Sequence, residues 1–273
     1  NYKENFKHIV MASWDVDNIL SAGDKKLSRT GLYMDADAPE MLTLKMIHGS
    51  WAGLKDPYSI MLSESTAKAF FGNANPVNQV MRMNNKFDVK VTGVYEDLPL
   101  NTQFKDLKFL SPIYLWFADN PWIKTSAMTD WQNHFLKIYA QIAPNTSFEQ
   151  VSHNIKDAEL KNLKDAKFKD EAALSPQVLV MPMRDWHLHS YKRGQPDNGP
   201  LQMVWLISII GTFVLLLACI NFMNLSTARS EKRAKEIGIR KAVGSLRMQL
   251  VGQFLSESFL IVVLAFCLSL VIV

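Results

Sequence analysis

The chain has 273 residues, with 30 Lys and Arg against 26 Asp and Glu and a net charge of +4. This length suffices for one domain of about 200 residues together with membrane helices. The basic excess is confined to one short segment near the C-terminus, so it does not indicate a nucleic-acid partner. The two cysteines lie in apolar runs, which excludes a disulfide framework or a cysteine metal site in the first 200 residues.

Residues 1–100 predict a mixed α/β lobe. Strand character is seen at Ile9–Trp14 and Leu27–Met34, and a short helix is expected at Asp37–Leu44. Phe87–Tyr95 alternates apolar and polar residues, which is typical of a half-buried strand.

A helix is predicted between Ser63 and Gly72. Ser63 is the expected N-cap, and Gly72 provides the C-terminal stop. The buried face would be formed by Ala67, Phe70 and Phe71, and Asn75-Pro76 predicts a turn after the helix.

Residues 101–134 predict an inserted subdomain. Leu107–Leu115 could form a strand, and Pro112 would restrict it to a sheet edge. The following segment, up to Trp131, is rich in aromatic residues and resembles a loop. Its large rings could form the core of the subdomain or a surface for cargo or a partner; they are Trp116, Phe117, Trp122 and Trp131.

Residues 135–185 predict a strand, a helix and a returning strand, and 186–200 a polar segment that leads to the membrane. The first strand is Phe135–Ile142, and the returning strand is Val178–Met181. Thr146 and Glu149 form a capping box at the start of the helix, which lies between these two strands. Its apolar stripe would consist of Phe148, Val151, Ile155, Leu160 and Leu163.

Catalytic signatures are not found in the sequence. It has no Walker A loop and no Gly-x-Ser-x-Gly motif, so no catalytic or cofactor-binding residue is predicted. His187 and His189 could face one side of a strand as metal ligands, or could lie near a membrane surface. Glu96 and Asp97 follow a strand and are interpreted as turn residues rather than an acid/base pair.

The run Met203–Phe222 contains no ionisable group and is long enough to cross about 30 Å of hydrocarbon. The alternative is a buried core helix of a large soluble protein. The expected organisation is an extracytoplasmic domain over 1–199, a membrane helix over 200–228, a cytoplasmic segment over 229–252 and the start of a second membrane helix over 253–273. The expected fold class is therefore α+β, followed by transmembrane α-helices.

The segment 229–247 carries seven basic residues against Glu231 and Glu236, whereas opposite charges balance over residues 1–228. A short basic loop between two spans is retained in the cytoplasm. Helical spacing would place apolar residues on one side of this segment and charged residues elsewhere. The apolar side would contain Ile237, Val243, Leu246 and Leu250. This pattern could rest on anionic lipid or contact a protein partner, with Gly238 and Gly244 allowing close approach or a bend.

The segment from Arg229 to Ser258 closely resembles the cytoplasmic segment of MacB- and FtsX-like ABC transporter permeases. These permeases share a pattern of an acidic residue, a glycine, a basic residue and then Ala-x-Gly. In this chain the pattern falls at Glu236, Gly238, Arg240, Ala242 and Gly244. It is followed by a Gln-Phe-Leu-x-Glu motif at 253–257, where the next membrane helix begins. The upstream sequence is similar to the MacB-type extracytoplasmic core at Met41–Trp51, at the 62–80 helix region and at 87–99.

The resemblance implies the membrane subunit of an ABC system, in the inner membrane, which does not itself hydrolyse ATP. It implies an ATPase partner, a second permease subunit, contact with membrane lipid and possible contact with other envelope proteins. The residues implied in coupling to the ATPase are Arg233, Glu236, Gly238, Arg240, Lys241 and Gly244. Two other functions remain open: a membrane-anchored sensor or scaffold without an ATPase, and an exported enzyme with a membrane tail.

Overall fold

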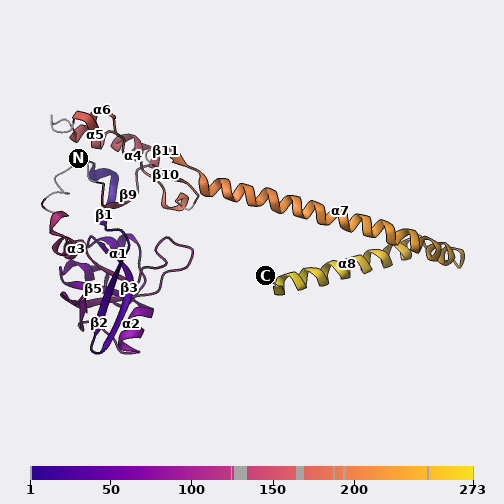
Figure 1. Cartoon of the computed structure of the whole chain (residues 1–273), viewed down its shortest axis with the longest axis horizontal. Coiled ribbons are helices and arrows are strands. Elements are labelled where there is room, and N and C mark those ends of the chain that lie inside the picture. Colours follow the sequence, from indigo (N-terminus) through magenta and orange to yellow (C-terminus); the bar gives the residue numbers. More distant parts are fainter. Residues whose placement is uncertain are drawn as a thin grey trace. The chain divides into compact units, whose positions relative to one another are not determined.

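The computed structural model describes residues 2–123, 125, 134–163, 169–186, 188–192, 195–244 and 246–272, with the backbone alone at 169, 171, 190–192, 195–196, 229–233, 235–236 and 247. The chain forms two units, Asn1–Val180 and Met181–Val273. Figure 1 shows the mixed sheet and short helices of the first unit and the long helices of the second.

The first unit is built on a mixed sheet that has nine strands among the described residues. Short helices connect and flank the strands (Figure 1): α1 (Ala38–Met41), α2 (Glu64–Phe71), α3 (Ile113–Asp119), α4 (Phe148–Ile155), α5 (Ala158–Asn162), α6 (Lys169–Ala173) and the 3-10 turns η1 (Lys3–Asn5) and η2 (Trp51–Lys55). The strands are β1 (Phe6–Ala12), β2 (Val16–Ala22), β3 (Lys25–Met34), β4 (Met46–Gly49), β5 (Ser59–Ser63), β6 (Val80–Met83), β7 (Phe87–Tyr95), β8 (Phe109–Pro112) and β9 (Lys137–Ile142).

Six strands of this sheet form a closed ring. β3 pairs with β2 on one side and with β8 on the other, and β6, β7 and β5 complete the circuit from β2 to β8. β1 meets β3 where Ala12 lies opposite Met34, β9 pairs along β1, and β4 pairs with β7. The ring thus joins segments that are separated by up to about 90 residues in the chain.

A hydrophobic core is formed by the ring strands together with α2 and α3. β7 alternates buried and exposed residues in its first half, as its sequence predicts, whereas all five residues of β5 are buried. The fully buried members include Leu20, Ile60, Leu62, Met83, Val89, Val91, Phe109 and Ile113. This core, without disulfides among its residues, stabilises the domain through apolar burial.

A buried polar cluster connects three of the ring strands. Asn18 of β2 donates a hydrogen bond to the hydroxyl of Tyr33 on β3 over 2.7 Å, and that hydroxyl lies 3.1 Å from the sulfur of Met83 on β6. Burial raises the pKa of Tyr33 to about 12, against the opposing effect of the Asn18 hydrogen bond. The phenol therefore stays neutral, and its polar contacts are satisfied inside the ring.

The predicted helix after Ser63 is confirmed as α2. The Ser63 hydroxyl accepts a hydrogen bond from the Thr66 N–H, and Gly72 ends the helix with φ +64°. Asp97 also contacts the first turn, because its carboxylate accepts hydrogen bonds from the Ser65 N–H and hydroxyl. Asp97 therefore supports a helix start, as expected for a turn residue rather than for an acid/base pair.

Two predictions for residues 107–131 are wrong. β8 is not an edge strand but lies between β5 and β3, and all four of its residues are buried. Pro112 is compatible with this position because it is the last residue of the strand. The start of the supposed loop is the helix α3, whose Trp116 and Phe117 are buried in the main core. Whether residues 101–134 form a separate inserted subdomain is not tested and stays a prediction.

Two further predictions between residues 146 and 181 are wrong. The N-cap of α4 is Ser147, which accepts a hydrogen bond from the Gln150 N–H, and not Thr146. The apolar stripe is divided between α4 and α5, with Val151, Ile155 and Leu163 buried. No strand is formed at Val178–Met181, where the Val178 N–H instead donates to the Lys156 carbonyl.

The second unit begins with the 3-10 turn η5 (Met183–Asp185) and a hairpin of β10 (Ser190–Lys192) and β11 (Gln195–Asp197). Two long helices follow, α7 (Gly199–Ala242) and α8 (Arg247–Ile272). Two stretches within them, Gly199–Ala228 and Met248–Ile272, are long and apolar enough to cross a membrane. Their most apolar windows have no buried residues, so the alternative of a buried core helix does not describe them within this chain.

Candidate functional site

Two regions have features that the packing of the fold does not require. The first is the turn between α7 and α8, where the predicted coupling residues are found. The second is a cavity beside Asp35 in the sheet domain, which the sequence did not predict.

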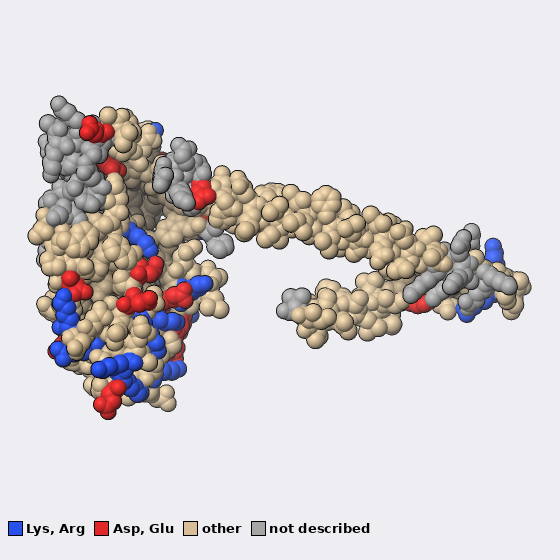
Figure 2. Space-filling model, in the orientation of Figure 1, with Lys and Arg blue, Asp and Glu red and all other residues tan. Residues whose placement is uncertain are grey.

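The predicted cytoplasmic segment is a direct continuation of the first membrane-length helix. α7 has 44 residues, of which the first 30 form the apolar stretch. At 1.5 Å per residue, the remaining charged part extends about 21 Å beyond it. In Figure 2, the charged side chains of the two long helices gather at the end where α7 meets α8. Arg240 and Lys241 lie in the last turn of α7, where the negative end of the helix dipole stabilises positively charged side chains.

The turn itself depends on Gly244. This residue has φ +99°, which is unfavourable for residues with a side chain, and its N–H donates to the Lys241 carbonyl over 3.2 Å. On the other side of the turn, the Gln249 side chain accepts a hydrogen bond from the Leu246 N–H at the start of α8. Gly244 thus provides the predicted bend and fixes where the two helices separate.

A side-chain hydrogen bond connects the helices near the turn. Arg240 donates to the Gln253 amide oxygen over 3.0 Å. Leu250 is 8% exposed in the same region. The Arg240 guanidinium is therefore held in a defined orientation at the basic end of α7.

The predicted apolar face of this segment is wrong in its second half. Val243 and Leu246 lie in the turn and are 82% and 67% exposed, so they do not continue the face of Ile237. A continuous helix would have aligned them, but α7 ends at Ala242. Among the described residues, no atom lies within 4 Å of the position that a Cβ of Gly238 would occupy, so none of them covers this side of α7.

The predicted coupling residues are brought together only in part by the described geometry. Gly238, Arg240, Lys241 and Gly244 lie within two turns of the α7 end. Arg233 and Glu236 lie on the same helix, but their side chains are outside the described set.

The predicted aromatic cluster is divided between core and surface. Trp116 and Phe117 are buried, as noted above, whereas Trp122 is 46% exposed and its ring centre lies 5.5 Å from that of Phe135. Trp131 lies outside the described residues. Of this cluster, Trp122 is the described residue with a ring available to a partner.

The predicted histidine pair is not tested, because His187 lies outside the described residues. Among the residues that are described, no group of three His, Cys, Asp or Glu side chains could hold a metal ion.

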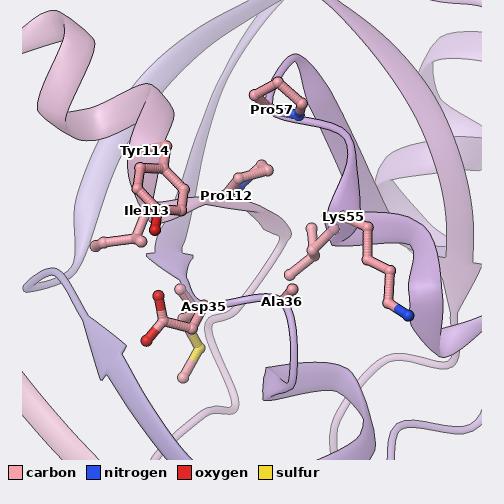
Figure 3. A pocket seen from close by; sticks show the side chains of 9 residues that line it. Asp35, Ala36, Lys55, Pro57, Pro112, Ile113 and Tyr114 are labelled. Atoms are coloured by element: carbon pink, nitrogen blue, oxygen red, sulfur yellow. The ribbon is translucent and has the colours of Figure 1, made fainter.

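The cavity in the sheet domain lies where β3 and β8 end side by side. Its volume is about 280 Å³, and Figure 3 shows side chains from three separate segments around it. It is lined by Met34, Asp35, Ala36, Leu54, Lys55, Pro57, Pro112, Ile113 and Tyr114. An acid directly after a predicted strand was the sequence signal that could have indicated it, but the other two segments are not predictable from local patterns.

Asp35 is the acidic residue of this cavity. Its carboxylate accepts a hydrogen bond from the Met11 N–H over 2.8 Å, and its own N–H donates to the Met11 carbonyl. Burial raises the pKa of Asp35; the Met11 hydrogen bond opposes this rise, and the nearby Asp37 charge adds to it. The carboxylate is therefore held rigidly in a setting that disfavours an unpaired negative charge.

Comparison with known proteins identifies two family regions in the chain, one in the sheet domain and one in the long helices. Residues 3–158 match the family model of the MacB-like periplasmic core domain, and residues 208–273 match that of the FtsX-like permease C-terminal region. Proteins named macrolide export ATP-binding/permease protein MacB are 22% identical in Marinobacter nauticus and 24% identical in Mannheimia succiniciproducens. These matches cover 79% and 95% of this chain but 30% and 37% of the relatives, so the chain spans about a third of their length.

Solved structures with a similar fold include the periplasmic region of MacB from Actinobacillus actinomycetemcomitans, at 17% identity and a TM-score of 0.42. That match covers 57% of this chain and 69% of the other. A domain of a permease protein from Porphyromonas gingivalis has 19% identity and a TM-score of 0.48, over 62% and 70% of the two chains. The periplasmic core model alone matches more than half of the chain, which therefore belongs to the permease family that joins a MacB-like periplasmic core domain to an FtsX-like permease region.

Proposed function

We propose that the protein is the membrane subunit of an ABC transporter and transmits motion driven by ATP hydrolysis from a cytoplasmic ATPase partner to its extracytoplasmic domain. In this proposal residues 1–199 lie outside the cytoplasm, α7 crosses the inner membrane, and the basic turn lies in the cytoplasm. The positive charge of the segment 229–247 supports this orientation. ATP is bound and hydrolysed by the partner rather than by this subunit.

The observation that carries the proposal is the continuity of α7. One helix joins the apolar stretch Gly199–Ala228 to the charged end at Arg240 and Lys241. A continuous helix has its backbone hydrogen bonds satisfied along its length and is stiff on this scale. A force applied at the basic end would therefore move the membrane part of the helix with it.

The coupling residues have distinct roles in this proposal. Arg233, Glu236, Arg240 and Lys241 provide charged contacts to the ATPase. Gly238 leaves its side of α7 open to a close approach by the partner backbone, in line with the free space around it. Gly244 fixes the turn on which the other contacts depend.

The assembly that follows contains two permease subunits, the ATPase and surrounding lipid, with further envelope proteins as contacts of the extracytoplasmic domain. The relatives are named for macrolide export, so a macrolide is the first cargo to test. We assign cargo or partner contact to Trp122 and Trp131. Replacing both with Ala should weaken macrolide binding without changing ATPase docking; unchanged binding by the folded variant would remove this assignment.

Charge reversal at the basic end tests the coupling. The double variant Arg240→Glu and Lys241→Glu should lose co-purification with the ATPase partner, and should lose stimulation of that partner's ATPase activity. Retained association would contradict the proposal. Strong binding of the wild-type segment to anionic vesicles with no ATPase partner would instead favour the sensor or scaffold function.

Two controls separate charge from structure. Lys26→Glu with Lys105→Glu makes the same change of net charge on exposed residues of the sheet domain and should leave docking intact. Gln253→Ala removes the hydrogen bond to Arg240 but keeps both cations. It should weaken docking less than the charge reversal does.

A further inference from the structure

The cavity beside Asp35 has mostly apolar walls. Met34, Leu54 and Ile113 at its base are almost completely buried, and Pro57 and Pro112 form two of its sides. Proline has a fixed φ and no N–H, so these walls are preformed and offer few hydrogen-bond donors. The cavity is thus suited to the apolar body of a ligand and unsuited to a sugar or another highly hydroxylated molecule.

Asp35 gives this apolar space a negative charge without a neutralising partner. None of the Lys, Arg and His side chains that the structure describes forms an ion pair with Asp35. In Figure 3 the Asp35 carboxylate and the Tyr114 hydroxyl point into the cavity towards each other, whereas the Lys55 ammonium points away. A half-buried carboxylate in such a place is stabilised by a cation that brings its own hydrogen-bond donors.

The size of the cavity restricts the ligand. Its volume of about 280 Å³ lies at the lower limit of small-molecule pockets, which is about 300 Å³. A whole macrolide is too large for it, and a single lysine side chain from a protein partner would leave much of it empty. Tyr114 is 62% exposed at the rim, where its ring can cover the bound molecule.

We propose that this cavity binds a small amphipathic ammonium ion, with the ammonium group on Asp35 and the Tyr114 hydroxyl and the apolar body against Met34 and Ile113. The ligand class is a primary amine with an aromatic or branched alkyl body. Binding occurs within the sheet domain and does not require the ATPase, so the inference is independent of the proposed coupling.

Phenethylammonium is a suitable probe, titrated calorimetrically into the full chain in lipid nanodiscs. Phenylethanol has nearly the same shape without the charge and should bind at least about tenfold more weakly, because it loses a charge-assisted contact. Affinity should rise with pH as Asp35 ionises and should fall again when the amine loses its proton. Equal affinity for the amine and the alcohol would overturn the proposal.

Asp35→Asn keeps an oxygen that can accept the Met11 hydrogen bond but removes the charge, and it should weaken phenethylammonium binding by at least about tenfold. Asp106→Asn makes the same change of net charge beside a different cavity and should have no effect. Ala36→Phe fills the cavity while Asp35 is retained, so it should abolish binding even if the first variant folds poorly. Undiminished binding by folded Asp35→Asn or Ala36→Phe would refute the site. A lysine-containing peptide that binds more tightly than the amine would assign the cavity to a protein partner and overturn the small-molecule proposal.

Discussion

The sheet domain buries its apolar side chains, whereas the two long helices expose side chains of the same kinds. Ile60, Met61 and Leu62 of β5 are fully buried in the domain, whereas Ile210, Phe213 and Leu217 of α7 are more than half exposed. The two sets have comparable hydrophobicity, so the difference lies in the surroundings that each requires. A β-ring buries apolar groups against its own residues, while a membrane helix leaves them for lipid and satisfies its backbone internally.

The most severe test of this comparison places the same charge at two equally exposed apolar positions. Leu215 on α7 is 65% exposed and Ile138 on β9 is 66% exposed. Leu215→Arg should reduce membrane insertion by about 3 kcal/mol, because the arginine would enter hydrocarbon. Ile138→Arg should change the unfolding free energy of the domain by less than about 0.5 kcal/mol, because that side chain faces water.

Insertion is measured by protease protection in isolated membranes, and domain stability by thermal unfolding of the full chain in nanodiscs. Equal sensitivity at the two positions would show that α7 does not meet lipid. A strong loss of domain stability in Ile138→Arg would show that β9 is covered by another protein surface.

Close packing within the ring gives the second prediction. A Cβ at Gly31 would lie 2.4 Å from the ring of Phe109 and 2.5 Å from the Phe109 carbonyl oxygen, whereas a Cβ at Gly211 of α7 would meet no atom within 4 Å. Gly31→Ala should therefore destabilise the domain by about 1 to 3 kcal/mol through overpacking. Its unfolding midpoint should fall, and Gly211→Ala should leave that midpoint unchanged. An unchanged midpoint in Gly31→Ala would mean that β3 and β8 are less closely packed than described.

The smallest effect concerns the carboxylate of Asp97. Burial alone would raise its pKa, but hydrogen bonds from Ser65 and Lys108 lower it below the ordinary value. A lowered folded-state pKa stabilises the domain above the unfolded-state value of about 3.9, and this contribution is lost as pH falls through the folded-state pKa. Asp97→Asn should therefore cost about 1 kcal/mol at pH 7, a figure reduced for partial solvent screening.

The stability difference between wild type and Asp97→Asn should shrink when thermal unfolding is repeated at progressively lower pH. The neighbouring Glu96 forms a more exposed pair with Lys45, so Glu96→Gln provides a matched control with no measurable change. A constant difference across the pH range would mean that Asp97 acts through its shape rather than through its charge.

Local features were predictable from the sequence where one short segment contains all the necessary information. The N-cap Ser63, the stop at Gly72 and the strand Phe87–Tyr95 are examples, because caps and alternation depend on adjacent residues. The two long apolar helices belong to the same class, since length and composition alone identify them.

Features that depend on distant segments were not predictable. β8 lies between β5 and β3, and its partners on β5 are more than 40 positions away in the chain. Because this pairing is not visible in the local sequence, Pro112 was wrongly interpreted as the sign of an edge strand. The cavity beside Asp35 likewise requires three segments to meet. In the coupling segment, Gly244 indicated a bend, but helical periodicity could not show that Val243 and Leu246 would lie in the turn.

Ring closure also determines how the sheet domain can meet other copies of itself. Along the described ring, each strand has a hydrogen-bonded neighbour on either side, so it offers no long row of unpaired backbone groups for strand addition. β1, β4 and β9 are the strands that lie outside the ring; β4 and β9 each have one described partner strand, and β1 pairs with β9 but meets β3 only at Ala12. Edge-to-edge aggregation of this domain would therefore begin at β1, β4 or β9, and β9 carries Lys137, a charge of the kind that discourages such pairing.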